Sequence, residues 1–486
     1  YLSIQQALSA IDRMEVRGRD SAGIHVFVWD HGLAVDDPWV QSVLAERHGD
    51  MLFESGAARL TGRCLSVVYK AAAEIGELGD NVRRIRAAIT EDELLRQALR
   101  GERAQVAVLG HTRWASVGII SEPNAHPVNS DELDRPGGST APFVVGVLNG
   151  DVDNHADLRA EHGLRIPGPI TTDAKVIPTI VARHAESVEL FEAFRRTVAS
   201  FEGSVAIGAA SADEPWRLLL ALHGSGQGVY VGLAEDRYVV ASEPYGVVEE
   251  TSRYVRLDGE HGGQILALDA RVAGTIEGMD RRGYDGSLQP VTEADVVTAE
   301  VTTRDIDRGD FPHFLLKEIT ESPDSFGKTL RGKIVEQEGL LRARVGARAL
   351  PEPIAKRLAA GEITRIRVIG QGTAAVAGQS MAAILDELAG GALDVAAMTA
   401  TELSGFGLRR DMSDTLAVAV SQSGTTTDTN RTVDLLRARG AVVLAIVNRR
   451  SSDLTDKADG VLYTSDGRDV EMSVASTKAF YAQVAA

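Results

Sequence analysis

The second half of the sequence alternates short apolar runs with helical stretches, and this alternation constrains the fold more than any other feature of the chain. The helical stretches are clearest at Ala374–Leu388 and Thr429–Gly440. The apolar runs are Arg365–Ile369, Ala392–Met398, Thr415–Val420, Val442–Val447 and Gly460–Thr464. Because buried strands that alternate with helices are typical of βαβ units, the pattern predicts an α/β doubly wound parallel sheet.

The first half of the sequence has a different pattern, in which short strand-like runs are joined by turns and only occasionally by helices. Helical spacing appears in the first fourteen residues and over Arg83–Arg100. The strand-like runs include Gly23–Trp29, Gln105–Leu109, Phe143–Leu148, Val205–Ala210, Trp216–Leu222, Val229–Leu233 and Tyr238–Ser242. Many short strands with few crossovers favour an antiparallel α+β domain.

The two patterns divide the chain into three parts. Residues 1–269 form the α+β part, the polar and acidic residues 270–310 are expected to be a connector, and residues 311–486 form the α/β part. The chain opens at Tyr1 rather than at Met and closes at Lys478–Ala486 within a predicted helix. We therefore expect an internal fragment of a longer protein, truncated at both ends.

Composition excludes several functions. The formal net charge of −18 disfavours binding to nucleic acids or to anionic membranes, because such a surface repels phosphates. The longest apolar runs, such as Ala441–Val447, are too short to span a bilayer. The single cysteine, Cys64, fits a cytoplasmic protein and is expected to be a buried small apolar residue. The histidines show no paired metal-ligand spacing, so neither a metal nor a cofactor is predicted.

A hydroxyl-rich loop follows the strand-like run Thr415–Val420. Residues Ser421–Thr429 carry six hydroxyl groups and one glycine, and a helix follows them. Backbone N–H groups and the positive end of the helix dipole at such a position bind phosphate. The alternative is that these residues only cap the helix and form a turn.

Two more loops of this half have similar chemistry. Gly370–Ala375 reads Gly-x-Gly-x-x-Ala, which also matches a dinucleotide fingerprint, with Asp394 or Glu402 near the distance expected of a ribose-binding acid. Glu471–Lys478 again contains Ser and Thr. Three hydroxyl-bearing loops favour a sugar phosphate over a dinucleotide.

The first half carries residues suited to an amino-acid zwitterion. Arg113 could pair with a carboxylate, Asp173 with an ammonium group, and Asn149 with the Gly150 N–H could hold an oxyanion. Each also has a simpler interpretation, as a surface charge or a turn residue. In this order, with His126 between them, they predict an amino-acid site.

These motifs together resemble one known family. Arg17–Gly23, His111–Ala115, Asn124–Pro127 and Leu148–Gly150 resemble the class II, N-terminal-nucleophile glutamine amidotransferase domain. His313–Ile319, Ser421–Thr426 and Val474–Phe480 resemble the phosphosugar-isomerase (SIS) domain. Both in this order resemble glutamine–fructose-6-phosphate aminotransferase. The resemblance implies a four-layer αββα glutaminase domain followed by the first SIS half, a cytoplasmic enzyme and a homodimer.

The resemblance also implies roles for particular residues. Glutamine would be held by Arg113 and Asp173 in a pocket shaped by Trp114, Ser116 and His126, and Asn149 and Gly150 would form the oxyanion hole. Fructose 6-phosphate would be held by Gly372, Thr373, Ser421, Gln422, Ser423 and Thr426, with Val474 and Ser476 closing that pocket. Ammonia released from glutamine would pass to the sugar, and isomerisation would give glucosamine 6-phosphate.

The sequence departs from the family in several places. The N-terminal Cys nucleophile is expected before Tyr1, and Cys64 cannot replace it because an internal residue has no free α-amine to act as base. An insertion is expected within residues 31–104, and the second SIS half is absent. Gln371 and Ala374 stand where the sugar loop usually has Cys and Ser. An amidotransferase for a different sugar phosphate, or a non-catalytic sugar-phosphate sensor, therefore remain alternatives.

Overall fold

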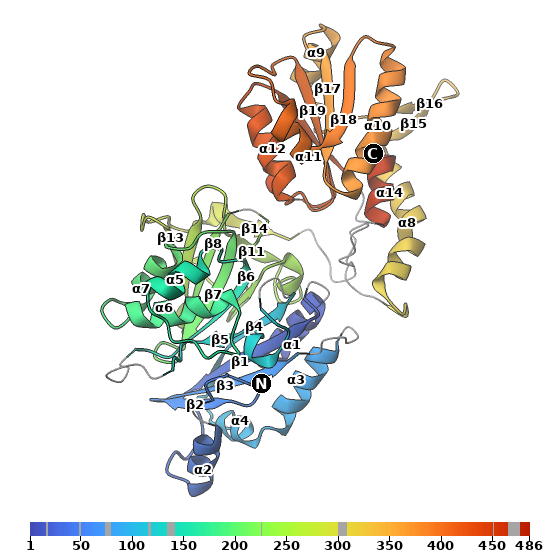
Figure 1. The fold of residues 1–486 in the computed structure, drawn as a ribbon. Helices are drawn as coiled ribbons and strands as arrows, with labels where there is room; N and C mark the ends of the chain where they lie inside the picture. Colours follow the sequence, from blue (N-terminus) through green and yellow to red (C-terminus); the bar gives the residue numbers. More distant parts are fainter. Residues whose placement is uncertain are drawn as a thin grey trace. The chain divides into compact units, whose positions relative to one another are not determined.

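The computed structural model of the chain describes residues 1–15, 18–47, 50–72, 79–114, 118–133, 141–224, 226–299, 309–450, 452–464 and 477–486. The chain forms two compact units, Tyr1–Thr303 and Arg304–Ala486 (Figure 1). Each unit has its own sheets and its own apolar core. Within the described ranges, none of the helices is both long and apolar enough to cross a lipid bilayer.

The first sheet of the N-terminal unit is antiparallel and has the strand order β2–β3–β1–β4. Its strands are β1 (Ser21–Trp29), β2 (Ala58–Thr61), β3 (Cys64–Ala71) and β4 (Gln105–Arg113). One face is covered by α1 (Leu2–Met14), α2 (Pro38–Arg47), α3 (Asp80–Glu91) and α4 (Glu93–Ala98). Ile4, Leu8 and Ile11 recur at helical spacing on α1, so they bury one face of that helix.

The second sheet of this unit has the order β13–β12–β8–β7–β6–β5. Its strands are β5 (Val128–Asn129), β6 (Val144–Gly150), β7 (Val205–Ser211), β8 (Arg217–His223), β12 (Gln264–Asp269) and β13 (Met279–Gly283). On its outer face pack α5 (His155–Glu161), α6 (Val176–His184) and α7 (Leu190–Val198).

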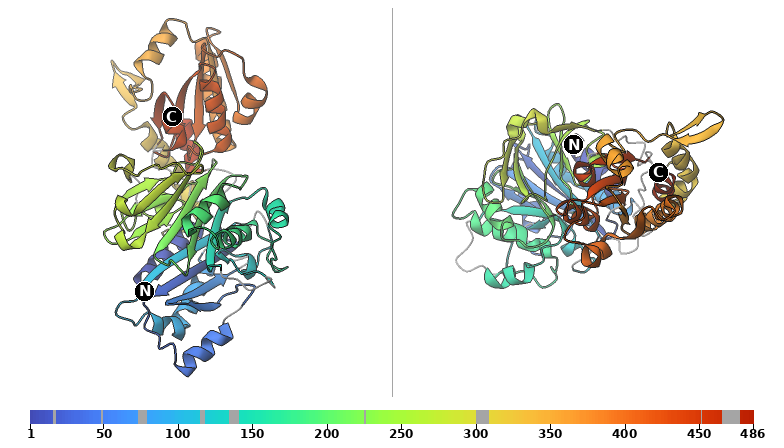
Figure 2. Two further views of the ribbon diagram at one scale, coloured as in Figure 1. Left: turned by 90° about the vertical axis from the view of Figure 1, so that its left-hand side faces the viewer. Right: turned by 90° about the horizontal axis from the view of Figure 1, so that it is seen from above.

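The two sheets pack face to face. Phe27, Val68 and Leu109 of the first sheet contact Val145 and Val147 of the second in one buried cluster. Helices therefore cover both outer faces of a two-sheet sandwich, which is the four-layer αββα arrangement expected for this half (Figure 2). Cys64 lies in the same cluster, and burial raises the pKa of its thiol to about 12, so its predicted role as a buried small residue is confirmed.

A third, smaller sheet packs against the second sheet of the sandwich. Its order is β10–β9–β11–β14, and its residues Val231 and Val255 pack on Leu220 and Leu266 of the second sheet. The strands are β9 (Tyr230–Leu233), β10 (Tyr238–Ala241), β11 (Arg253–Arg256) and β14 (Val296–Thr298). The structure thus places β13 and β14 within residues predicted as a connector. Their polar composition reflects partly exposed edge strands.

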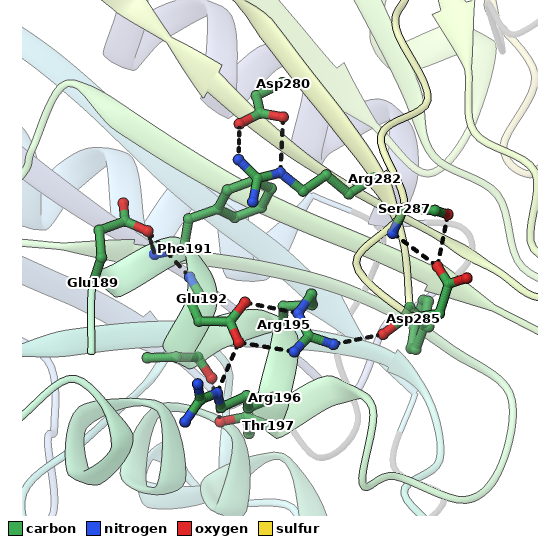
Figure 3. Close-up of polar contacts among 12 residues, drawn as sticks. Glu189, Phe191, Glu192, Arg195, Arg196, Thr197, Asp280, Arg282, Asp285 and Ser287 are labelled. Atoms are coloured by element: carbon green, nitrogen blue, oxygen red, sulfur yellow. Dashed lines mark hydrogen bonds and ion pairs between the residues drawn. The ribbon is translucent and has the colours of Figure 1, made fainter. Parts of the chain in front are cut away.

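A polar network fixes α7 to the edge of the second sheet (Figure 3). Glu189 caps α7 by accepting the N–H groups of Phe191 and Glu192. Arg195 pairs with Glu192 and also donates to the Tyr284 carbonyl at 2.8 Å. Arg282, held by Asp280, stacks 4.8 Å from the centre of the Phe191 ring. These contacts join residues of α7 to β13 and the turn after it.

The C-terminal unit contains the predicted parallel sheet, with strand order β18–β17–β19–β20–β21. Its strands are β17 (Arg365–Gly370), β18 (Asp394–Thr399), β19 (Thr415–Ser421), β20 (Val442–Val447) and β21 (Gly460–Tyr463). One face packs against α12 (Thr427–Arg437) and the other against α9 (Glu352–Ala359) and α10 (Thr373–Ala389). The α/β doubly wound prediction is confirmed.

The remaining elements of this unit flank the sheet. They are α8 (Phe314–Leu330), the hairpin of β15 (Ile334–Gln337) and β16 (Leu340–Ala343), α11 (Ala400–Glu402), α13 (Asp453–Lys457) and α14 (Lys478–Ala485). An ion pair between the buried Lys478 and the partly exposed Glu321, at 2.6 Å, joins α14 to α8.

Candidate functional site

The first candidate site lies where β4 ends and the short 3-10 turn Asp173–Lys175 begins. Arg113 and Asp173 are each only 4% exposed. The Asp173 carboxylate accepts the N–H groups of Val152 at 2.9 Å and Ala174 at 3.0 Å. Burial raises the pKa of Asp173 and lowers that of Arg113, while the negative charge of Asp173 partly opposes the shift at Arg113. Two opposite buried charges therefore share one site.

His126 is placed beside these charges and is electrically neutral. The N–H of Leu148 donates to its Nδ1 at 3.4 Å, so the proton belongs on Nε2, which lies 3.1 Å from the Thr172 hydroxyl. Burial, together with the neighbouring His111 ring and the charge of Arg113, holds the pKa of His126 well below its ordinary value. The ring centroid lies 4.7 Å from that of His111. His126 thus contributes an uncharged ring to the first candidate site.

Asn149 and Gly150 occupy the end of β6. Gly150 has φ +97°, and a Cβ added to it would lie 2.0 Å from the Ser204 carbonyl oxygen. Only glycine fits that position. Asn149 is exposed and lines a cavity of about 250 Å³ whose other walls are largely apolar, including Leu109, Val147 and Val240. β4 and β10, the last strands of their sheets among the described residues, both contribute to this cavity.

The structure places Trp114 at the surface, and two further residues of the predicted site and its motifs are not described. Trp114 is 59% exposed at the end of β4. Ser116 and the motif residue Arg17 lie outside the described residues. Arg113, His126, Asn149, Gly150 and Asp173 all lie at the ends of strands, or in turns, of the same two-sheet sandwich.

The second candidate site consists of strand-to-helix loops at the carboxyl edge of the parallel sheet. Ser421 ends β19, and its hydroxyl accepts the Gly424 N–H at 3.0 Å. Ser423 accepts the N–H of Thr425 at 3.2 Å, and Thr426 is the N-cap residue of α12. The Gln422 carbonyl accepts the N–H groups that follow β20. These contacts fold the loop back onto the start of the helix.

The neighbouring loop meets this one through Gln371. Its Nε2 lies 3.4 Å from the Thr401 hydroxyl and 3.3 Å from an Asp428 carboxylate oxygen. Gly372, with φ +55°, is the N-cap residue of α10, and Thr373 opens that helix. The structure therefore brings Gly372, Thr373, Ser421, Gln422, Ser423 and Thr426 to one edge of the sheet. Val474 and Ser476 lie outside the described residues.

The sequence patterns assigned no role to Asn124, although the run that contains it was noted. The structure buries Asn124 completely, and its side chain accepts the N–H groups of Thr171 at 2.7 Å and Thr172 at 2.9 Å. It also donates to the Pro169 carbonyl at 2.9 Å. Asn124 thus fixes the backbone directly before Asp173. The signal available in the sequence was an asparagine two residues before His126, within the same short run.

No group of three or more His, Cys, Asp or Glu side chains positioned to hold a metal ion occurs in the described parts of the chain. The described residues of both candidate sites carry amide, hydroxyl, guanidinium and carboxylate groups. These are suited to binding a zwitterion in one unit and a phosphate in the other.

The two units and their sites define a two-domain chain of the glutamine amidotransferase–SIS class. The SIS domain family matches residues 362–486. Over 78% of this chain, glutamine–fructose-6-phosphate aminotransferase of Symbiobacterium thermophilum is 34% identical, and that of Pyrobaculum aerophilum is 32% identical. The chain belongs to the glutamine–fructose-6-phosphate aminotransferase family. It spans about half the length of these relatives, 56% of each.

A solved structure is similar over a larger share of the chain but much more distantly. Glutamine phosphoribosylpyrophosphate amidotransferase from B. subtilis is 15% identical, covers 95% of this chain and 88% of its own, and has a TM-score of 0.39.

Proposed function

We propose that the protein containing this chain transfers ammonia from glutamine to fructose 6-phosphate and isomerises the product to glucosamine 6-phosphate. One observation carries the proposal. The same chain holds a buried arginine and a buried aspartate, Arg113 and Asp173, in its sandwich unit and a hydroxyl-rich loop at a helix N-terminus in its SIS unit. The first suits an amino-acid zwitterion and the second a phosphate dianion.

In the sandwich unit, Arg113 binds the glutamine carboxylate and Asp173 its ammonium group. Trp114, Ser116 and His126 shape the pocket. An N-terminal Cys of the intact protein, deprotonated by its own α-amine, adds to the amide carbon of glutamine. Asn149 and the Gly150 N–H stabilise the resulting oxyanion. Ammonia then leaves, and water hydrolyses the thioester to glutamate.

In the SIS unit, the phosphate is held by Ser421, Ser423 and Thr426 with the N–H groups that open α12. Gly372, Thr373 and Gln422 border the sugar, and Val474 and Ser476 close the pocket. Burial of the dianion against a helix N-terminus supplies binding without a metal. Ammonia from the first unit reaches the sugar without entering bulk water.

A second candidate function is amination of a different sugar phosphate. The observation in its favour is at Gln371, whose side chain contacts Thr401 and Asp428 across the mouth of the loop. Ala374, beside it, supplies no hydroxyl. The glutamine is larger than the Cys usual at its position, and the alanine lacks the hydroxyl of the usual Ser. Both differences change the space and the contacts available to the sugar.

We also propose that the intact protein acts as a homodimer in the cytoplasm. The single cysteine is in keeping with a reducing compartment, and the dimer follows from the family resemblance. Light scattering of the purified protein measures the mass directly. A monomer at micromolar concentration would contradict the dimer.

Calorimetric titration of the 486-residue chain with glutamine tests the first half of this function. We expect Arg113→Ala to weaken glutamine binding by about 2–4 kcal/mol, because a carboxylate loses its charged partner. Binding of fructose 6-phosphate to the other unit should not change. Arg63→Ala is the matched control, because Arg63 is a largely exposed arginine paired with Asp30. Equal weakening of both ligands would contradict two separate sites.

A further inference from the structure

The segment Asp50–Gly56, between α2 and β2, runs close to the first candidate site. We propose that this segment is a strap that holds the loop carrying Asp173 in position, with Glu122 and Asn124 as the positioning residues between them. The inference rests on the proposed role of Asp173 in glutamine binding. It assigns a function to residues that the glutamine-binding set does not include.

The last link of this chain of contacts is Asn124. Its carboxamide is fully buried and contacts one loop at three points, namely the Pro169 carbonyl and the N–H groups of Thr171 and Thr172. A carboxamide that uses both its oxygen and its nitrogen in this way fixes the loop in two directions. Asp173 follows immediately. A shift of Asn124 therefore moves the Asp173 backbone.

The middle link is Glu122, which begins the 3-10 turn Glu122–Asn124. Its carboxylate accepts the N–H of Ser55 at 3.1 Å. The Ser121 hydroxyl accepts the side-chain N–H of Asn124 at 2.9 Å. Hydrogen bonds therefore hold both neighbours of Pro123. A hydrogen bond to a carboxylate is stronger than one between neutral groups. The strap thus holds the turn on which Asn124 lies.

The strap is itself fixed to the first sheet. The Ser55 hydroxyl accepts the Lys70 N–H at 3.1 Å, and the Gly56 N–H donates to the Val68 carbonyl at 2.8 Å, both on β3. Phe53 is buried between the sheets with its ring centroid 6.3 Å from that of Phe143. The strap therefore has a rigid base from which it can hold Glu122.

The other side of the strap is held by α2. Arg47, the last residue of α2, donates to the Gly56 carbonyl and pairs with Asp92 at 2.6 Å. Asp92 also accepts the Tyr69 hydroxyl at 2.7 Å and caps α4. The side chains of Arg47 and Asp92 are largely buried, so this anchor is protected from water.

The experiment uses the 486-residue chain and two readouts, calorimetric glutamine affinity and amide hydrogen exchange of the peptide that contains Pro169–Asp173. Glu122→Ala should weaken glutamine binding roughly ten-fold and speed exchange of the Thr171 and Thr172 amides, because the turn loses its hydrogen bond to the strap. Glu122→Gln keeps an acceptor oxygen and should restore both readouts to within about three-fold of the original protein.

Glu54→Ala is the matched control. Glu54 is an exposed carboxylate on the same strap, and its replacement should leave both readouts unchanged. Unchanged exchange and unchanged affinity in Glu122→Ala would overturn the strap, as would a failure of Glu122→Gln to differ from Glu122→Ala. If the original chain bound no glutamine, the proposed function would fail, whereas the exchange readout would still decide the strap.

Discussion

At the scale of single residues, the backbone conformation and the surroundings of Gly150 leave no room for a side chain. Its φ is positive, and a methyl group on its Cα would lie 2.0 Å from the Ser204 oxygen. We expect Gly150→Ala to destabilise the N-terminal unit by roughly 2–4 kcal/mol, as backbone strain and a steric clash add. Chemical denaturation followed by intrinsic fluorescence measures this loss.

Gly163 separates the two causes. It also has a positive φ, +55°, but no atom lies within 4 Å of an added Cβ. Gly163→Ala should therefore cost only the strain, about 1 kcal/mol. Equal losses of unfolding free energy in the two variants would mean that the clash with Ser204 does not destabilise Gly150→Ala.

Two buried histidines make the stability of the same unit depend on pH. Burial lowers the pKa of His25 to about 3 and that of His111 to about 4. Both stay neutral in the folded protein while the unfolded chain binds a proton near pH 6.5. The unfolded state therefore binds more protons below pH 6.5. Stability should fall by up to about 1.4 kcal/mol per pH unit per histidine, until the pH reaches the folded pKa.

Replacement of His25 isolates its share of this effect. His25 lies against Phe27, Phe53 and Phe143, so phenylalanine suits the site. The free energy of unfolding of His25→Phe should drop less between pH 6.5 and pH 5 than that of the original chain. Urea denaturation at the two pH values gives the comparison. An identical drop in both proteins would contradict a neutral buried His25.

At the scale of elements, the loop between β19 and α12 is the unit that we expect to bind phosphate. Ser423→Ala should weaken binding of fructose 6-phosphate and of inorganic phosphate to a similar extent, by roughly 1–3 kcal/mol, because a hydrogen bond to a charged group is lost. Calorimetry with each ligand measures this. Ser413→Ala, at the exposed amino end of β19, should have no effect.

The same titration distinguishes a phosphate loop from a dinucleotide loop. If NAD bound instead and Ser423→Ala were silent, the Gly370–Ala375 loop would be the binding element. The contact of Gln371 with Asp428 bears on this choice, because it places a side chain where an open dinucleotide loop would need room.

At the scale of the whole molecule, the parallel sheet could be predicted from sequence and the sandwich only in part. Buried parallel strands such as β19 are apolar throughout, so the pattern reveals them directly. β13 alternates buried and partly exposed residues on a sheet edge, and its polar side chains hid it within the supposed connector. Edge strands lack the apolar signal on which pattern-based prediction depends.

The candidate sites also contain some residues that could be predicted from sequence and others that could not. The hydroxyl loop is continuous in sequence, so its residues could be predicted together. Arg113 and Asp173 were named from their chemistry and from resemblance, because no local pattern says that two distant loops meet. The strap escaped prediction altogether. Its contact with Glu122 uses the backbone N–H of Ser55, and a backbone donor leaves no trace in the sequence.

The arrangement of β4 and β10 has a consequence for how the chain behaves in solution. Among the described strands each has one neighbour, β1 and β9 respectively, so each presents a row of backbone N–H and C=O groups along its other side. Backbone groups that no neighbouring strand pairs bind water instead. We expect ordered water molecules along these two strands, inside the cavity that both of them line and whose side chains are largely apolar.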